Sequence, residues 1–188
     1  TQENLKKLID QDFGICGPGS GEQACGDVGL GRMLEPLDIL DMFSLSFNEG
    51  TLSGKKILIT AGPTQEPIEP VRFITNRSSG KMGYSLVEAA LESGANVTLI
   101  SGPVNIEPPS NCNFVSIKTA EEMYDAVMHH ISGMDVYIGT AAVSDYSPAK
   151  ASDSKIKKDG SSSPMVLELK ENQDILKSVS ELEQRPYV

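Results

Sequence analysis

The sequence contains no tryptophan, only two histidines and only three cysteines among its 188 residues. The cysteines, Cys16, Cys25 and Cys112, are odd in number and form no pair with metal-ligand spacing, so a disulfide framework is not expected. A reducing compartment, the cytoplasm, fits this cysteine usage best. The two histidines are the adjacent His129 and His130 on a predicted helix. Adjacent helical side chains point about 100° apart, so these two are not expected to hold one metal ion together.

The sequence also shows neither a long hydrophobic run nor the pattern of a signal peptide. No apolar run approaches the roughly 18 residues of a membrane span, and residues 1–20 lack the basic-then-apolar pattern of a secretory signal. Basic residues are outnumbered, 16 Lys and Arg against 26 Asp and Glu, which gives a formal net charge of −10. Because such a chain repels phosphate backbones, we expect no nucleic-acid partner. The lack of a long apolar run leads us to expect no membrane partner either. A phosphate group would have to be bound by a local arrangement of residues.

The first quarter of the chain has a different composition from the rest. Residues 1–13 are predicted to form a helix, and the glycine-rich residues 14–31 are predicted to form a flexible loop. An apolar stretch over 34–47, with Pro36 in its first turn, predicts a second helix. Residues 48–54 then have the composition of a linker. The chain therefore opens with a loop-rich segment.

From residue 55 the pattern becomes regular. Strands are predicted at 55–60, 96–101, 113–117 and 135–139, and helices at 79–93 and 120–131, the latter with a capping box of Thr119 and Glu122. A long polar loop at 144–163, a half-exposed strand at 165–170 and a short helix at 173–181 follow, and residues 185–188 resemble the start of another strand. This alternation predicts an α/β fold, Rossmann-like, with a mostly parallel sheet and helices on both of its faces.

The loop after the first strand of this region lacks the dinucleotide fingerprint. A nicotinamide-dependent enzyme would have GxGxxG directly before its first helix. Here about 17 residues, beginning Ala61-Gly62-Pro63, separate the strand from the helix. This counts against a dehydrogenase, although a Gly-Pro pair is also common in a plain turn.

The start of the helix near residue 80 has the composition of an anion site. Ser78 or Ser79 can cap the helix, and Gly80 and Gly83 leave room for a phosphate near the backbone amides. Lys81, together with Arg72 before it, can add positive charge. The alternative is an ordinary serine cap with a glycine chosen for helix–sheet packing.

Two further segments carry candidate ligand groups. Small residues and Asp145 follow the strand at 135–139, where Asp145 could bind a metal ion, a ribose or a base, or could simply cap the backbone. The densest basic cluster, Lys155-Ile156-Lys157-Lys158, lies in the next polar loop. Its charges could offset a triphosphate, or they could form a solvated face.

These segments together resemble a known family. From Gly54 to Val188 the chain resembles the phosphopantothenate–cysteine ligase domain of coenzyme A biosynthesis; the motifs are ITAGPTQEPIEPVRFITNRSSGKMG at 59–83, GANVTLISGP at 94–103, GTAAVSDY at 139–146 and KIKK at 155–158. The segment ACGDVGLGRMLEP at 24–36 resembles the end of the flavin-dependent phosphopantothenoylcysteine decarboxylase domain. The resemblance implies a piece of a bifunctional protein: decarboxylase tail at 1–47, linker at 48–54, and an incomplete ligase domain at 55–188.

The resemblance implies a CTP-dependent ligation in two half-steps. The carboxylate of 4′-phosphopantothenate forms an acyl-cytidylate with CTP, and the amine of cysteine then displaces CMP. Asn76 would act on the acyl group with Ala141 and Ala142 beside it, Lys155 would meet the phosphates, and Asp145 would hold the Mg²⁺ that accompanies CTP. The residues placed at the nucleotide are Gly62, Ser78, Gly80, Gly83, Gly139, Thr140, Ala141, Asp145, Lys155, Gln173, Asp174, Ile175 and Leu176. Gln173 stands where many relatives have proline.

For the front segment, the resemblance implies that Cys25 donates a proton in the FMN-dependent decarboxylase of the full-length protein, which we expect to be a homo-oligomer. The flavin-binding body is not in this sequence, so we expect no decarboxylase activity from this chain and, without the residues that relatives have after Val188, no complete ligase. The alternatives are a short-chain oxidoreductase-like domain or a non-catalytic nucleotide-sensing module. Tyr146 and Lys150 have the Tyr-x-x-x-Lys spacing of the first, but Pro148 argues against the helix that this pair requires.

Overall fold

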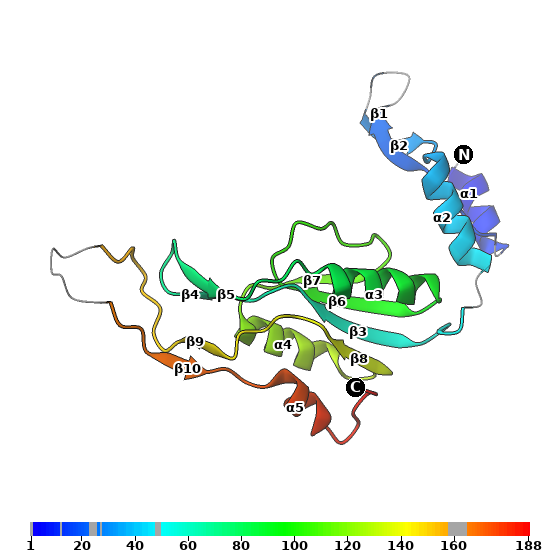
Figure 1. Ribbon diagram of the computed structural model, residues 1–188. Coiled ribbons are helices and arrows are strands. Elements are labelled where there is room, and N and C mark those ends of the chain that lie inside the picture. The colour runs from blue at the N-terminus through cyan, green and yellow to red at the C-terminus, as the bar shows by residue number, and fades with distance from the viewer. Residues whose placement is uncertain (1, 12, 23–25, 27, 48–49, 158–164) are drawn as a thin grey trace. The chain divides into compact units, whose positions relative to one another are not determined.

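The computed structural model describes all residues except 1, 12, 23–25, 27, 48–49 and 158–164 (Figure 1). The chain divides into two units, residues 1–48 and residues 49–188. Among the described residues, none of the helices is long and apolar enough to cross a membrane.

The described part of the first unit contains two helices and two paired strands. Its elements are α1 (Gln2–Asp10), β1 (Gly19–Glu22), β2 (Val28–Arg32) and α2 (Pro36–Phe47). Strands β1 and β2 pair antiparallel, so the loop predicted over 14–31 agrees with the structure at 14–18 but was wrong at 19–22 and 28–31. Glycine-rich strands carry few side chains and show no apolar alternation, which is why the sequence pattern did not reveal them. Helix α2 begins at Pro36, in agreement with the prediction that Pro36 lies in its first turn.

The second unit is built on a four-stranded parallel sheet in the order β7-β6-β3-β8. The strands are β3 (Lys56–Ala61), β6 (Asn96–Ser101), β7 (Asn113–Ser116) and β8 (Val136–Gly139). Strand β3 lies between two neighbours and is covered on both faces, so all its residues from Ile57 to Ala61 are buried. This explains its continuous apolar run, and it confirms the predicted α/β class with a parallel sheet.

Helices cover both faces of this sheet, as predicted (Figure 1). Helix α3 (Lys81–Glu92) lies on one face, and α4 (Ala120–His130) and α5 (Ile175–Ser180) lie on the other. The alternating side chains of β3 divide between the two cores: Ile57 and Ile59 pack with α3, whereas Leu58 packs with α4 and α5. Each core therefore uses one side of the same central strand.

The two long helices begin in different ways. At α4 the predicted capping box is confirmed: the amide of Glu122 donates to the Thr119 hydroxyl at 3.1 Å, and Glu122 accepts in return from the amide of Thr119 at 3.2 Å. At α3 the predicted serine cap is wrong, because the N-cap residue is Gly80 in the left-handed conformation, with φ of 73°, and no side chain caps the helix. The sharp turn into α3 requires a glycine at that position.

Two small antiparallel pairs extend from the sheet region, and the sequence did not predict them as such. One is the hairpin of β4 (Gln65–Pro67) and β5 (Phe73–Thr75), and the other pairs β9 (Tyr146–Pro148) with β10 (Leu169–Glu171). Because Tyr146 lies on a strand, it and Lys150 do not form the helical pair of a short-chain oxidoreductase. Tyr187 pairs in parallel with Val136 of β8, as expected for the start of a further strand.

Candidate functional site

The loops that leave β3 and β8 are joined at the carboxyl edge of the sheet. The amide of Ala142 donates to the carbonyl oxygen of Gly62 at 2.8 Å, and the amide of Thr64 donates to the carbonyl oxygen of Ala142 at 3.3 Å. The chain leaves β3 through α3 toward β6 on one side, whereas β8 lies on the other side of β3. This edge is thus a topological switch point, the place where open α/β sheets bind ligands.

Asn76 connects a third loop, the one between β5 and α3, to these two by hydrogen bonds. Its side-chain nitrogen Nδ2 donates to the carbonyl oxygens of Ala142, at 3.3 Å, and Val143, at 3.1 Å. The neighbouring Thr75 hydroxyl donates to the carbonyl oxygen of Thr64 at 2.7 Å. The predicted site residue Asn76 therefore lies beside the predicted site residue Ala142, although 66 positions separate them in the chain.

Gly62 and Gly80 meet where the loop after β3 passes the start of α3. Both have a left-handed backbone, with φ of 71° and 73°. A Cβ atom on Gly80 would lie 2.8 Å from Cγ1 of Val104 and 3.4 Å from the backbone nitrogen of Gly62. Two predicted phosphate-binding positions are thus adjacent, and each has a local reason to be glycine. The nearby Ser78 hydroxyl accepts from the amide of Gly80 at 3.3 Å.

Gly83 is a packing position in this structure. A Cβ atom there would lie 2.6 Å from both Cβ of Ala61 and Oγ1 of Thr140, so the glycine lets α3 lie close to the sheet. Thr140 is held in turn by its hydroxyl, which donates to the carbonyl oxygen of Thr60 at 2.6 Å. The structure therefore favours close helix–sheet packing as the reason for a glycine at this position.

A cavity of about 290 Å³ opens beyond β8, on the face of the sheet that α5 covers. Seven of the residues that the family resemblance places at a nucleotide line it: Gly139, Ala141, Asp145, Gln173, Asp174, Ile175 and Leu176. The sequence did not single out the other lining residues, which are Thr60, Tyr137, Val143, Ser144, Glu171 and Asn172. Segments about 30 residues apart in the chain are thus brought to one cavity, which below we name the β8 cavity.

One residue that lines the β8 cavity has a buried polar atom without a partner. Ser144 is 5% exposed, and among the buried side-chain nitrogen and oxygen atoms of the described residues its hydroxyl alone lacks a hydrogen-bond partner. Its backbone is fixed on both sides, by Thr64 Oγ1, 3.0 Å from its nitrogen, and by Asn172 Nδ2, 2.8 Å from its oxygen. Burial raises the pKa of Tyr137, whose ring lines the same cavity, so its hydroxyl is a neutral hydrogen-bonding group there.

The carboxylates at the β8 cavity differ in what they already bind. Asp174 caps α5, because its Oδ1 accepts from the amide of Lys177 at 2.9 Å. Asp145 and Glu171 are exposed at the lining. In the described part of the chain, no group of three or more His, Cys, Asp or Glu side chains is arranged to hold a metal ion. Carboxylate oxygens of this kind are hard donors, which Mg²⁺ takes together with phosphate oxygens.

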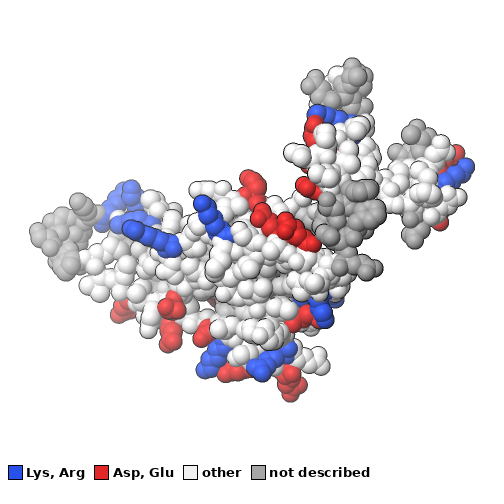
Figure 2. All heavy atoms as spheres, turned by 45° about the vertical axis from the view of Figure 1, so that its right-hand side comes forward, with Lys and Arg blue, Asp and Glu red and all other residues white. Residues whose placement is uncertain are grey.

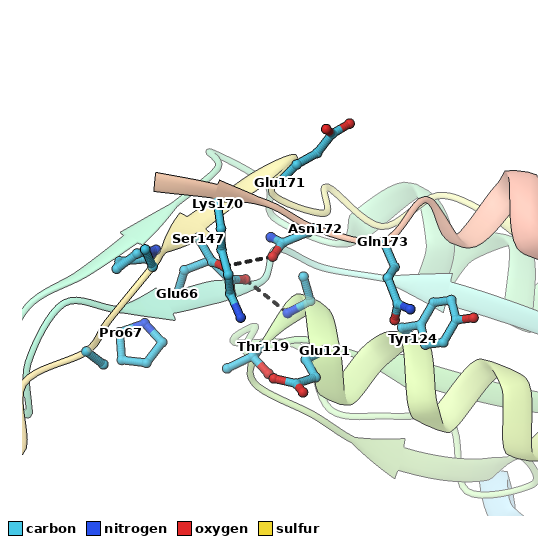
Figure 3. Close-up of a pocket in the computed structure, with 14 residues that line it drawn as sticks. Glu66, Pro67, Thr119, Glu121, Tyr124, Ser147, Lys170, Glu171, Asn172 and Gln173 are labelled. Carbon is cyan, nitrogen blue, oxygen red and sulfur yellow. Dashed lines mark hydrogen bonds between the residues drawn. The ribbon is translucent and has the colours of Figure 1, made fainter. Parts of the chain in front are cut away.

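A second, larger cavity of about 450 Å³ lies at the start of α4, and the sequence analysis missed it (Figure 3). Lys170 and Gln173 point into it from the β10 side, whereas Glu171 points away (Figure 3). The buried Glu66 on its wall accepts from the amide of Ala120 at 3.0 Å. The walls of this cavity include β4, β9 and β10, whose pairings the sequence did not predict. The sequence pattern therefore could not indicate a cavity here. It shares the wall formed by 171–173 with the β8 cavity.

The remaining predicted residues lie elsewhere or outside the described part. Lys155 lines neither cavity; it belongs to a loop that is attached to the turn between β4 and β5. Basic side chains gather at this end of the second unit (Figure 2). Cys25 and Lys158 lie outside the described residues.

Fold and site together define a Rossmann-like α/β domain with a ligand-sized cavity at the switch point of its sheet. Residues 52–188 match the family model described as "DNA/pantothenate metabolism flavoprotein C-terminal domain". The chain belongs to this family.

The chain is similar in sequence to curated bacterial proteins that share one name. The chain is 52% identical to the coenzyme A biosynthesis bifunctional protein CoaBC of Vibrio vulnificus strain YJ016, over 100% of this chain and 47% of that protein. It is 46% identical to the protein of the same name from Escherichia coli strain K12, again over 100% of this chain and 47% of that one. The chain thus spans about half the length of the curated relatives it matches.

The solved structures agree on the fold. The crystal structure of the C-terminal domain of a CoaBC protein matches with a TM-score of 0.62 and 45% identity, over 72% of this chain and 62% of that chain. The DNA/pantothenate metabolism flavoprotein from Streptococcus pneumoniae matches with a TM-score of 0.62 and 28% identity, over 71% of this chain and 67% of that chain.

Proposed function

We propose that the second unit binds CTP and ligates cysteine to 4′-phosphopantothenate, a step of coenzyme A biosynthesis. The observation that carries this proposal is the β8 cavity, where residues of the GTAAVSDY segment meet residues 173–176. Its size and its place at the switch point suit the nucleoside part of CTP. The 45% identical C-terminal domain of a CoaBC protein supports the same assignment.

The proposed reaction has two displacements. A carboxylate oxygen of 4′-phosphopantothenate attacks the α-phosphorus of CTP, an O–P bond forms, and pyrophosphate leaves as its bond to the α-phosphorus breaks. The amine of cysteine then attacks the acyl carbon of the acyl-cytidylate. The amide bond forms, the acyl–oxygen bond breaks, CMP leaves with the bonding electrons, and the amine loses its proton to solvent.

Each proposed residue has a physical task in this reaction. The amides near Gly62, Ser78 and Gly80 would bind phosphate oxygens at the start of α3. Asn76, whose Nδ2 already donates to the carbonyl oxygens of Ala142 and Val143, would lie beside the acyl group as a neutral side chain that does not repel anionic ligands. Lys155 would add positive charge at the phosphates.

The other residues would hold the nucleoside and its metal ion. The lining of the β8 cavity, with Gly139, Ala141 and 173–176, would enclose the base and ribose, whereas Thr140 and Gly83 would support it by packing. Asp145 would hold Mg²⁺ against the triphosphate, where the ion supplies charge neutralisation.

We propose that the first unit is the C-terminal segment of an FMN-dependent phosphopantothenoylcysteine decarboxylase domain, with Cys25 as its proton donor. The bifunctional relatives, which match over the whole of this chain, support this. So does the exposure of large apolar side chains in the unit, because Val28, Leu30 and Leu37 are 80%, 74% and 73% exposed. Such surfaces are usually covered by further protein.

The test of the ligase proposal is a nucleotide-binding and turnover measurement on the full-length protein that carries this chain. Calorimetric titration with CTP, ATP and NADPH should give the tightest binding for CTP. Pyrophosphate should be released from CTP only when 4′-phosphopantothenate is present, and the amide should form only after cysteine is added. Preferred binding of NADPH, or pyrophosphate release that does not depend on 4′-phosphopantothenate, would contradict the proposal.

A further inference from the structure

The buried carboxylate of Glu69 binds the backbone of Ile156, which lies between Lys155 and Lys157 in the loop after β9. The side chain of Glu69 is 0% exposed, and its Oε2 accepts from the amide of Ile156 at 2.9 Å. Its other oxygen, Oε1, accepts from Nε of Arg72 and from the amide of Val71, both at 3.2 Å. Both carboxylate oxygens of Glu69 are thus engaged.

Arg72 completes the attachment from the other side of the same residue. Its Nη2 donates to the carbonyl oxygen of Ile156 at 3.1 Å. The ion pair of Glu69 and Arg72 therefore binds both backbone groups of Ile156, and we name this arrangement the Ile156 clamp. A further backbone hydrogen bond, from the amide of Ser152 to the carbonyl oxygen of Ile68 at 2.9 Å, ties the loop to the same turn.

The Ile156 clamp acts on a residue that lies between two lysines. Lys155 and Lys157 are exposed and leave the backbone on either side of Ile156. Fixing the backbone of a loop residue removes conformational freedom that a ligand would otherwise have to remove on binding. A lysine side chain that starts from a fixed backbone therefore loses less entropy when it meets an anion.

We propose that Glu69 is a positioning residue for Lys155, which it places for the nucleotide phosphates by holding the backbone of Ile156. The inference rests on the proposed function, because it takes Lys155 as a phosphate-binding residue. Glu69 itself touches no substrate in this scheme. Its short distances to the loop, and its complete burial beside a half-exposed arginine, are what a permanent anchor requires.

The experiment has two readouts on the full-length protein. In the first, amide hydrogen exchange of Ile156 should become much faster in Glu69→Gln, because the neutral amide is a weaker acceptor and loses the ion pair with Arg72. In the second, CTP affinity is measured for Glu69→Gln, Lys155→Gln and the double variant. Each single variant should bind CTP roughly fivefold to tenfold more weakly, and the double variant no more weakly than Lys155→Gln alone.

A matched control is available three residues earlier. Glu66 is also buried in the hairpin of β4 and β5, but its carboxylate accepts from the amide of Ala120 in α4 instead of from the loop. Glu66→Gln should leave the exchange of the Ile156 amide unchanged, and its effect on CTP affinity should add to that of Lys155→Gln. If Glu69→Gln does not fold, Arg72→Gln removes the other half of the clamp at a half-exposed position.

The outcomes separate the two proposals. Unchanged exchange at Ile156, or additive losses in the double variant, would overturn the positioning role while CTP binding stands. Unchanged CTP affinity in Lys155→Gln would overturn it as well, because Lys155 would then not meet the phosphates. Failure of the unsubstituted protein to bind CTP would overturn the proposed function and this inference with it.

Discussion

The side-chain amide of Asn76 lies 3.1 Å from the carbonyl oxygen of Val143, to which it donates a hydrogen bond across 67 positions of the chain. The same nitrogen donates to Ala142, so the loop before α3 is fastened to the loop after β8. In Asn76→Asp the donor is replaced by a carboxylate that faces two carbonyl oxygens and repels anionic ligands. We expect cysteine ligation by the full-length protein to fall roughly 100-fold, the size of loss seen when an electrostatic contact to reacting groups is removed.

The control for this variant is Asn113→Asp. Asn113 also reaches another strand with its side-chain amide, which lies 3.5 Å from the Thr98 hydroxyl, but it is remote from the loops after β3 and β8. Ligation rates are compared for both variants at saturating CTP. A rate in Asn76→Asp that matches the unsubstituted protein would remove Asn76 from the site.

The main sheet and its helices could be predicted from the sequence because their patterns are local. The apolar run over 55–60, the stripe of α3 and the capping box of α4 each arise within a few residues, and each prediction agrees with the observed element. The pairs β4–β5 and β9–β10 depend on partners elsewhere: Gln65 donates to the carbonyl oxygen of Lys118, and β10 pairs with β9 about 20 residues earlier. Such short strands have no period of their own to detect.

The candidate site could be predicted in part, but through the family resemblance and not through local patterns. The resemblance placed Asp145 and residues 173–176 at one ligand, and the structure brings them to the β8 cavity. It could not find Ser144, whose unpartnered hydroxyl follows from packing, nor Glu69, whose partner Ile156 is 87 positions away. Contacts of that kind arise from tertiary structure and leave no spacing in the sequence.

Replacing Gly83 by alanine should destabilise the second unit. The new Cβ would lie 2.6 Å from Cβ of Ala61, which is fixed on β3, so α3 would have to move. Such overpacking costs about 1–3 kcal/mol, and the better helix propensity of alanine, about 1 kcal/mol, offsets only part of it. We expect a net loss of about 1 kcal/mol in urea unfolding.

Gly139→Ala is the matched comparison, because the nearest atom to its new Cβ would be 3.5 Å away, an ordinary contact. Its unfolding free energy should stay within about 0.5 kcal/mol of the unsubstituted value. Equal stabilities of the two alanine variants would show that Gly83 is not a packing position.

Asp135 should make stability depend on pH in the acid range. The hydrogen bond from the amide of Lys56, at 2.8 Å, lowers the pKa of Asp135, and the nearby charge of Lys55 adds to this effect. Because its folded pKa is below the unfolded value of about 3.9, its contribution is complete above that pH and is lost as pH falls through the folded pKa.

The variant Asp135→Asn tests this. It should be less stable than the unsubstituted chain at pH 7, and the two urea midpoints should converge as the pH is lowered below the ordinary aspartate pKa. A difference in midpoint that stays constant from neutral to acid pH would show that the ionised carboxylate of Asp135 contributes nothing.

Ser144→Ala should stabilise the protein in the absence of ligand. The Ser144 hydroxyl is buried and unpartnered, whereas its backbone hydrogen bonds to Thr64 and Asn172 do not involve the hydroxyl and would remain. Removing an unsatisfied buried hydroxyl should raise the free energy of unfolding by about 1 kcal/mol. Ser101→Ala is the opposite case: the Ser101 hydroxyl donates to the carbonyl oxygen of Gly102 at 2.9 Å and accepts from the Tyr84 hydroxyl at 3.3 Å, so its loss should cost about 1–3 kcal/mol. Urea unfolding of both variants measures the change in the free energy of unfolding, which should be positive for Ser144→Ala and negative for Ser101→Ala. Destabilisation by Ser144→Ala would contradict the prediction and would mean that a bound water or another group satisfies this hydroxyl in solution.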